Sequence, residues 1–175
     1  MLSNREMNEL MDTYSGYLLQ VSYTYVKNWA TAEDLVQESF IKFFKSYGQF
    51  REEATVKTYL TRIAINTCHD YLRSWKNKTQ IFSNLLIKKE ADRQKGIEAR
   101  LIASIEQTEL TKHVMQLPII YREVILLFYY EEYTSVAVAE LLGLSENTVK
   151  TRLRRARAML KERLGEMEWE VLSHE

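Results

Sequence analysis

Basic side chains concentrate in one stretch toward the end of the 175-residue sequence. Residues 148–164, TVKTRLRRARAMLKERL, hold seven Lys or Arg in seventeen positions. Lysine attracts phosphate as a point charge, and arginine can also bind guanine through two hydrogen bonds. These residue types suit DNA, although a charged run can also be only the solvated face of a helix.

The residues before this stretch predict a helix-turn-helix. Residues 136–142 have the apolar pattern of a short helix, and Gly143 can take the left-handed conformation that closes one. Ser145 then caps a second helix, with Glu146 in its first turn. In this motif the second helix can enter the DNA major groove, so the turn and the cap favour DNA binding more than basicity alone.

The second helix is expected to have two distinct sides. One side is an apolar stripe with spacings of three and four residues, which predicts contact with the rest of the domain. That stripe contains Val149, Leu153, Ala156, Leu160 and Leu164. The side chains that project elsewhere are Lys150, Thr151, Arg154, Arg155 and Arg157.

Residues that could carry out catalysis are scattered. His69, His113 and His174 are far apart in the sequence, no glycine-rich loop could hold a phosphate, and the carboxylates form no evident metal cluster. Cys68 is the single cysteine and lies on an apolar helical stripe, which favours a buried core residue over a nucleophile. The sequence therefore predicts no enzyme active site, no metal and no cofactor.

The composition favours an all-α fold. The chain has only five Gly and one Pro, and residues that favour helices are plentiful. Helical periodicity begins near Met7, Thr31 and Tyr59, and Thr31 with Asp34 predicts a capping box at the start of the second helix. Residues 46–55, SYGQFREEAT, predict a loop, and Pro118 predicts the first turn of a later helix.

A polar segment divides the sequence. Residues 76–100 lack an apolar stripe long enough for a core helix, so we expect two small helical domains, 1–76 and 105–175, joined by a flexible linker, 77–104. The net charge is zero, but residues 1–50 are acidic and residues 146–163 are basic, which predicts surfaces with different partners. No signal segment and no apolar run of about 20 residues is evident, which predicts a soluble cytoplasmic protein without membrane insertion.

Three blocks in order resemble the extracytoplasmic-function subgroup of bacterial RNA polymerase sigma factors. They are TAEDLVQESF (31–40), TYLTRIAINTCHDYLR (58–73) and LPIIYREVILLFYYEEYTSVAVAELLGLSENTVKTRLRRARAML (117–160). The resemblance implies a subunit that binds core RNA polymerase and directs it to promoter DNA, and that is not itself an enzyme. It also implies that the helix corresponding to residues 31–45 docks on the polymerase clamp. The implied polymerase contacts are Asp34, Gln37, Glu38 and Ile41.

The resemblance further implies that the N-terminal domain recognises and melts the -10 element. The loop around residues 47–54 would capture a flipped base, since extruded bases are held by aromatic faces and basic groups. The implied -10 contacts are Tyr47, Phe50, Arg51, Lys57, Arg62 and Asn66. Tyr59 stands where the family usually has Trp, and its place on the buried stripe favours core packing. Glu52 and Glu53 replace small residues, which predicts a weaker or more selective -10 site.

The C-terminal domain would read the -35 element with the helix that begins at Ser145. The implied contacts to bases and phosphates are Ser145, Asn147, Thr148, Lys150, Thr151, Arg154 and Arg155. Asn147 occupies a place usually given to Gly, and Ala137 replaces a common acidic residue. The resemblance also implies an anti-sigma factor as a partner. The alternative is a stand-alone helix-turn-helix regulator that dimerises on a two-fold operator.

Overall fold

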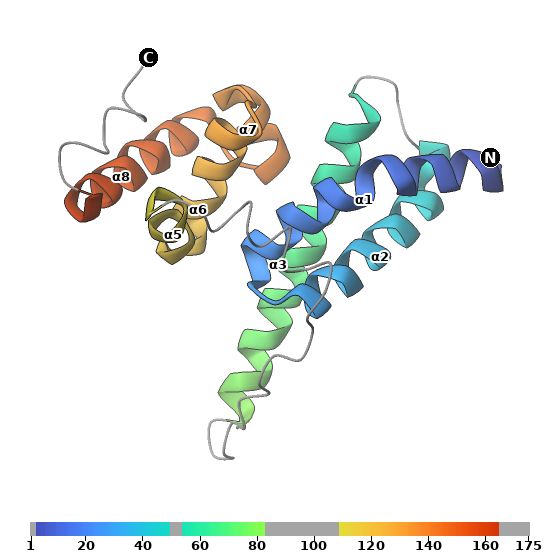
Figure 1. Cartoon of the computed structure of the whole chain (residues 1–175), viewed down its shortest axis with the longest axis horizontal. Coiled ribbons are helices and arrows are strands. Elements are labelled where there is room, and N and C mark those ends of the chain that lie inside the picture. Colours follow the sequence, from blue (N-terminus) through green and yellow to red (C-terminus); the bar gives the residue numbers. More distant parts are fainter. Residues whose placement is uncertain (1–2, 50–53, 83–108, 165–175) are drawn as a thin grey trace. The chain divides into compact units, whose positions relative to one another are not determined.

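The computed structural model describes residues 3–49, 54–82 and 109–164 (Figure 1). All regular structure in these ranges is helical. The helices form two compact units, one with α1, α2 and α3 and the other with α5 to α8. This confirms the predicted all-α fold with two small helical domains. No helix in the described ranges is long and apolar enough to cross a bilayer.

Three helices pack on one another in the first unit. They are α1 (Asn4–Val26), α2 (Trp29–Ser46) and α3 (Val56–Phe82), with a short 3-10 turn, η1 (Tyr47–Gln49), after α2. Their shared core contains Leu18, Val36, Phe40, Phe43, Leu60 and Ala64. Phe43 is fully buried, which contributes about 1.5–3 kcal/mol, and the ring of Tyr59 tilts against it at 5.8 Å.

The predicted capping box at Thr31 is wrong. The cap of helix α2 lies three residues earlier, at Asn28, whose side-chain oxygen accepts a hydrogen bond from the Thr31 N–H at 2.9 Å, and the helix begins at Trp29. The physical reason is the buried ring of Trp29, which stacks on Tyr23 of α1 with 4.0 Å between centroids. Because Trp29 packs there as the first residue of the helix, Thr31 lies in the first turn, where its backbone N–H donates a hydrogen bond to the cap.

Helix α3 is longer than the sequence predicts. It begins after Thr55, whose hydroxyl accepts from the Thr58 N–H at 3.1 Å, and it continues to Phe82, beyond the expected boundary at residue 76. Within it Cys68 is buried, as predicted, and desolvation raises the pKa of its thiol to about 11. Of the predicted loop 46–55, Ser46 ends α2 and η1 follows, while residues 50–53 lie outside the described residues.

The second unit is built around its last helix. It contains α5 (Glu109–Gln116), α6 (Ile119–Ile125), a π-helical turn η2 (Leu126–Tyr130), α7 (Ser135–Leu142) and α8 (Glu146–Leu164). Helix α8 contacts α5, α6 and α7. Pro118 directly precedes α6 as its N-cap, one position before the predicted first turn. The π turn η2 follows α6 directly.

The predicted helix-turn-helix is confirmed. Thr134 caps α7 by accepting a hydrogen bond from the Ala137 N–H at 3.2 Å. Gly143 ends α7 in the left-handed conformation, with φ of 64°. The Ser145 hydroxyl accepts from the Thr148 N–H at 3.2 Å, which caps α8. Each of these local signals is present in the sequence at the position where the structure uses it.

Candidate nucleic-acid interface

The buried side of α8 fixes which of its side chains face outward. Val149, Leu153, Ala156 and Leu160 are buried, as predicted, and Leu164 is half-buried at the end of the helix. Because a helix turns about 100° per residue, this stripe directs the residues between its members away from the domain. The outward side of α8 is therefore fixed by packing over several turns.

The residues predicted to read DNA lie on the outward side. Ser145, Asn147, Lys150, Arg154 and Arg155 are exposed, and Thr148 and Thr151 are half-buried. Among the described residues, the guanidinium groups of Arg154 and Arg155 form no ion pair, whereas Lys150 and Arg152 of the same helix pair with Glu146 and Glu123. These two exposed guanidinium groups on one helix could bind a polyanion.

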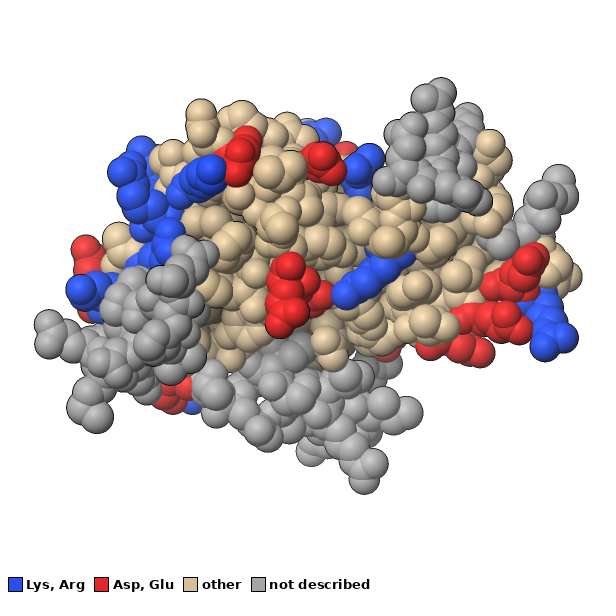
Figure 2. Space-filling model, turned by 90° about the horizontal axis from the view of Figure 1, so that it is seen from above, with Lys and Arg blue, Asp and Glu red and all other residues tan. Residues whose placement is uncertain are grey.

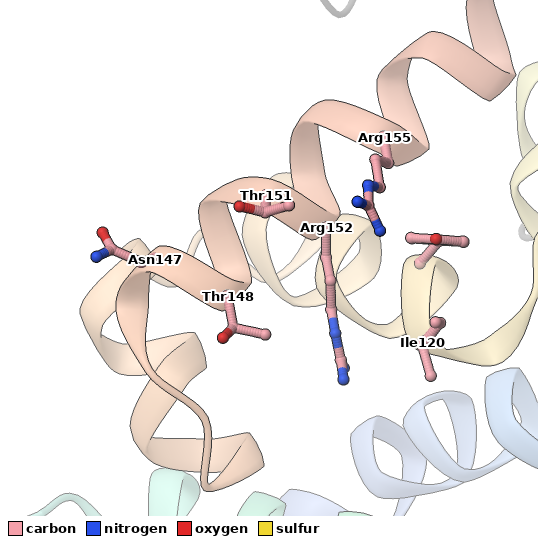
Figure 3. Close-up of a pocket in the computed structure, with 7 residues that line it drawn as sticks. Ile120, Asn147, Thr148, Thr151, Arg152 and Arg155 are labelled. Carbon is pink, nitrogen blue, oxygen red and sulfur yellow. The ribbon is translucent and has the colours of Figure 1, made fainter.

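An open groove of about 310 Å³ lies between α8 and the start of α6. Its lining residues are Ile120, Tyr121, Asn147, Thr148, Thr151, Arg152 and Arg155. Figure 3 shows Arg152 and Arg155 extending from neighbouring turns of α8 toward the end of α6 that carries Ile120, while Asn147 points away. Four of the predicted -35 residues therefore lie along one groove. Ser145, Lys150 and Arg154 do not line it.

Arg152 is a groove residue that the sequence analysis missed. Its guanidinium donates a hydrogen bond to the Glu123 carboxylate at 3.0 Å, and Glu123 lies on α6 with only 5% of its side chain exposed. The neighbouring Arg122 is also buried and donates to the carbonyl oxygen of Met115 at 2.7 Å. Arg152 thus ties the helix proposed to read DNA to the core of its unit. No local signal links residues so far apart in the sequence.

Glu146 holds together the two helices of the motif. Its carboxylate accepts a hydrogen bond from the Ser135 hydroxyl at 2.7 Å and pairs with the Lys150 ammonium at 2.8 Å. The hydrogen bonds from Lys150 and then Ser135 lower the pKa of Glu146. The four-residue spacing of Glu146 and Lys150 is a signal for this pair that the sequence analysis did not use.

The predicted polymerase-binding residues share one exposed face of α2. Asp34, Gln37, Glu38 and Ile41 are all exposed, and their spacings of three and four residues place them on the same side of the helix. Ile41 is 53% exposed, which is unusual for so large an apolar side chain. Lys42 pairs with Glu38 at 2.8 Å and also donates to Thr67 of α3 at 3.1 Å, so Glu38 is held by a side chain that bridges two helices.

The predicted -10 residues are not all brought together. Phe50, Arg51, Glu52 and Glu53 lie outside the described residues. The ammonium group of Lys57 lies 4.2 Å from the centroid of the Tyr17 ring. Lys57 and Asn66 are about two and a half helical turns apart, so they lie on opposite sides of α3.

Arg62 and Asn66 do share one face of α3. Asn66 is exposed, and Arg62 is half-buried, with its Nε atom buried and lacking a hydrogen-bond partner among the described residues. Tyr47 is half-buried and meets Phe43 edge-on at 5.5 Å. Tyr59 donates a hydrogen bond from its hydroxyl to the Ser46 hydroxyl at 2.9 Å, which supports its predicted packing role.

Charge is segregated on the surface as well as in the sequence. Figure 2 shows Lys and Arg side chains gathered on the unit that contains α8, whereas Asp and Glu side chains gather where α1 begins. The zero net charge of the chain therefore hides a basic surface on the unit that carries the helix-turn-helix.

Comparison with known proteins identifies both units. The family described as Sigma-70 region 2 matches residues 10–78, and that described as Sigma-70, region 4 matches residues 108–160. RNA polymerase sigma factor SigV of Bacillus subtilis (strain 168) is 32% identical over 142 residues, which cover 81% of this chain and 81% of SigV. ECF RNA polymerase sigma factor SigW of the same strain is 28% identical over 166 residues, which cover 91% of this chain and 89% of SigW.

A solved structure shows the same fold. The sigma factor RpoE in complex with the anti-sigma factor NepR, from Bartonella quintana, matches with a TM-score of 0.71 and 22% identity over 90% of this chain and 96% of that one. Together with the sequence relatives, this places both helical units in one known architecture. The chain belongs to the extracytoplasmic-function subgroup of bacterial RNA polymerase sigma factors.

Proposed function

We propose that this sigma factor directs promoter-specific initiation through three separate surfaces, one on α8, one on α2 and one on α3. Sigma factors are DNA-binding regulators, and we infer that this chain has no catalytic activity of its own because the polymerase carries out the chemistry. Core polymerase and promoters lie in the bacterial cytoplasm, and we place the protein there.

The surface on α8 is proposed to read the -35 element. The observation that carries this proposal is that Arg154 and Arg155 are exposed on the second helix of a helix-turn-helix and form no ion pair with any described residue. Arginine can donate two hydrogen bonds to guanine, which gives sequence discrimination. Thr148 and Thr151 line the adjacent groove, where their hydroxyl groups can donate to the DNA backbone.

The surface on α2 is proposed to bind core polymerase. An exposed apolar side chain within a polar rim is typical of a protein interface, and Ile41 with Asp34, Gln37 and Glu38 has this arrangement. The bridge from Lys42 to both Glu38 and Thr67 supports the proposal, since it holds the Glu38 carboxylate in place before binding.

The surface on α3 is proposed to contact the -10 element. Arg62 and Asn66 offer a cation and an amide on one helix face, which suits a separated DNA strand. We propose that Tyr47, Phe50, Arg51 and Lys57 also contact the -10 element. Lys57 would approach DNA from the side of α3 that faces α1, where Tyr17 now holds its ammonium group.

We also infer that an anti-sigma factor binds this chain. The similar structure of RpoE was solved in complex with the anti-sigma factor NepR. The exposed face of α2 offers such a partner the same side chains that it offers to the polymerase, so the two would compete.

Reconstitution tests the proposed function. The purified chain is added to bacterial core polymerase, and run-off transcription is measured on a library of genomic fragments. We expect specific transcripts that depend on the added chain, with shared sequences at both promoter elements. Transcription from no fragment, together with tight binding of a dimer of the chain to a palindrome, would favour the stand-alone regulator instead.

A further inference from the structure

One carboxylate connects the first turns of both helices in the helix-turn-helix. Ser135 is the first residue of α7, and Glu146 is the first residue of α8. The Ser135 hydroxyl and the Lys150 ammonium both contact the same oxygen of Glu146, Oε1, at 2.7 Å and 2.8 Å. The side chain of a proposed DNA reader is therefore linked through Glu146 to the start of α7.

These contacts restrain Lys150 before DNA arrives. A glutamate anchored by a hydroxyl from another helix moves less than a solvated one. The Glu146 carboxyl is ionised at neutral pH, and the hydrogen bonds from Lys150 and then Ser135 lower its pKa further. An ammonium group has three N–H donors, so the donor given to Glu146 leaves two for DNA. The pair also offsets the positive charge that would otherwise draw Lys150 to the nearest phosphate.

We propose that Glu146 is a positioning residue for -35 specificity, which acts by directing Lys150 toward base acceptors and away from backbone phosphates. The inference rests on the proposed function of α8. Phosphate contacts bind all sequences alike, whereas base contacts distinguish them. A Lys150 released from Glu146 would become a phosphate contact, so affinity for unrelated DNA would rise and discrimination would fall.

The test uses holoenzyme assembled from the full chain and bacterial core polymerase. Its substrate is the most strongly transcribed genomic fragment, compared with the same fragment carrying a scrambled -35 element. Glu146→Gln retains an acceptor for Ser135 but removes the charge that holds Lys150. We expect the ratio of affinities for the two DNAs to fall about fivefold. We also expect the salt dependence of binding to the scrambled fragment to steepen by about 1 in log–log slope.

The matched control is Glu162→Gln. Glu162 is an exposed glutamate on the same helix near its other end, so the variant removes an equal charge from α8. Its affinity ratio should equal that of the wild type. Ser135→Ala should shift the ratio in the same direction as Glu146→Gln but by less, because the Glu146–Lys150 pair is retained.

A double-mutant cycle shows whether Glu146 acts through Lys150. In the Lys150→Ala background, Glu146→Gln should leave the ratio unchanged. An unchanged ratio in the wild-type background, or an equal fall in both backgrounds, would overturn the positioning role. A wild-type holoenzyme that is indifferent to scrambling of the -35 element would instead overturn the proposed function of α8.

Discussion

The Glu123 carboxylate of α6 is 5% exposed, and the Arg152 side chain that meets it is 22% exposed. Two such charges are costly to bury, and their mutual attraction offsets that cost only while both are present. Arg152 also lines the groove beside the proposed reading residues. This ion pair therefore connects the stability of the second unit to the position of the side chains proposed to face DNA.

Loss of one partner should destabilise the second unit alone. Glu123→Ala leaves the Arg152 guanidinium without its partner, and we expect a cost of about 3 kcal/mol. Amide hydrogen exchange should then become about a hundredfold faster in α6 and α8, while exchange in α1 to α3 stays unchanged. The control is Glu140→Ala, at an exposed position of α7. Equal protection of α8 in both variants would show that the pair contributes nothing.

At the scale of helices, the sequence predicts caps, ends and buried faces correctly where these features depend on contacts between nearby residues. The cap at Ser145, the left-handed Gly143 and the buried stripe of α8 all depend on neighbours within a few residues, and the sequence predicts them correctly. The cap at Thr31 is wrong because a contact between helices, Trp29 on Tyr23, decides where α2 begins. The sequence alone does not show which aromatic side chains will meet.

The candidate site likewise has some features that the sequence could predict and others that it could not. Exposure of the proposed reading residues follows from the helical period, so the sequence could predict it. The Glu123–Arg152 pair could not be predicted, because it joins residues separated by two other helical segments, η2 and α7. The separation of Lys57 from Asn66 follows from helix geometry alone, and the resemblance to the family obscured it by grouping both residues as one DNA-binding set.

Two glycines, one within a helix and one directly after a helix, should respond to alanine in opposite ways. Gly16 is exposed within α1, with open space around its Cβ position, so Gly16→Ala should stabilise the first unit by about 0.5–1 kcal/mol. Gly143 has φ of 64°, so Gly143→Ala should destabilise the second unit by about 1 kcal/mol. Thermal unfolding followed by circular dichroism measures both changes.

Gly143→Asn provides the control for backbone conformation. Asparagine tolerates the left-handed region better than alanine, so its loss of stability should be smaller. Equal losses for the two Gly143 variants would indicate that the cost comes from the added side chain and not from the positive φ.

At the scale of the whole molecule, acidic and basic side chains are concentrated on different helices, which matches the different functions proposed for those helices. The exposed face of α2 carries acidic residues together with Ile41. The basic residues lie on α8, the second helix of the helix-turn-helix. The side chains proposed for polymerase binding and those proposed for -35 reading therefore belong to different compact units. Variants in one unit should leave the activity of the other intact, because neither set of side chains contributes to the other's core.

Paired variants test this division. Ile41→Ala with Glu38→Ala removes an apolar contact and a carboxylate from α2, and we expect the Kd for core polymerase to rise about tenfold or more. Arg154→Ala and Arg155→Ala should leave that Kd unchanged, while the holoenzyme loses its preference for the native -35 element over a scrambled one. Fluorescence anisotropy of the labelled chain measures polymerase binding, and promoter competition measures preference. If the arginine variants instead abolished association with core polymerase, α8 would belong to the polymerase interface, and the -35 element would have to be read by other residues.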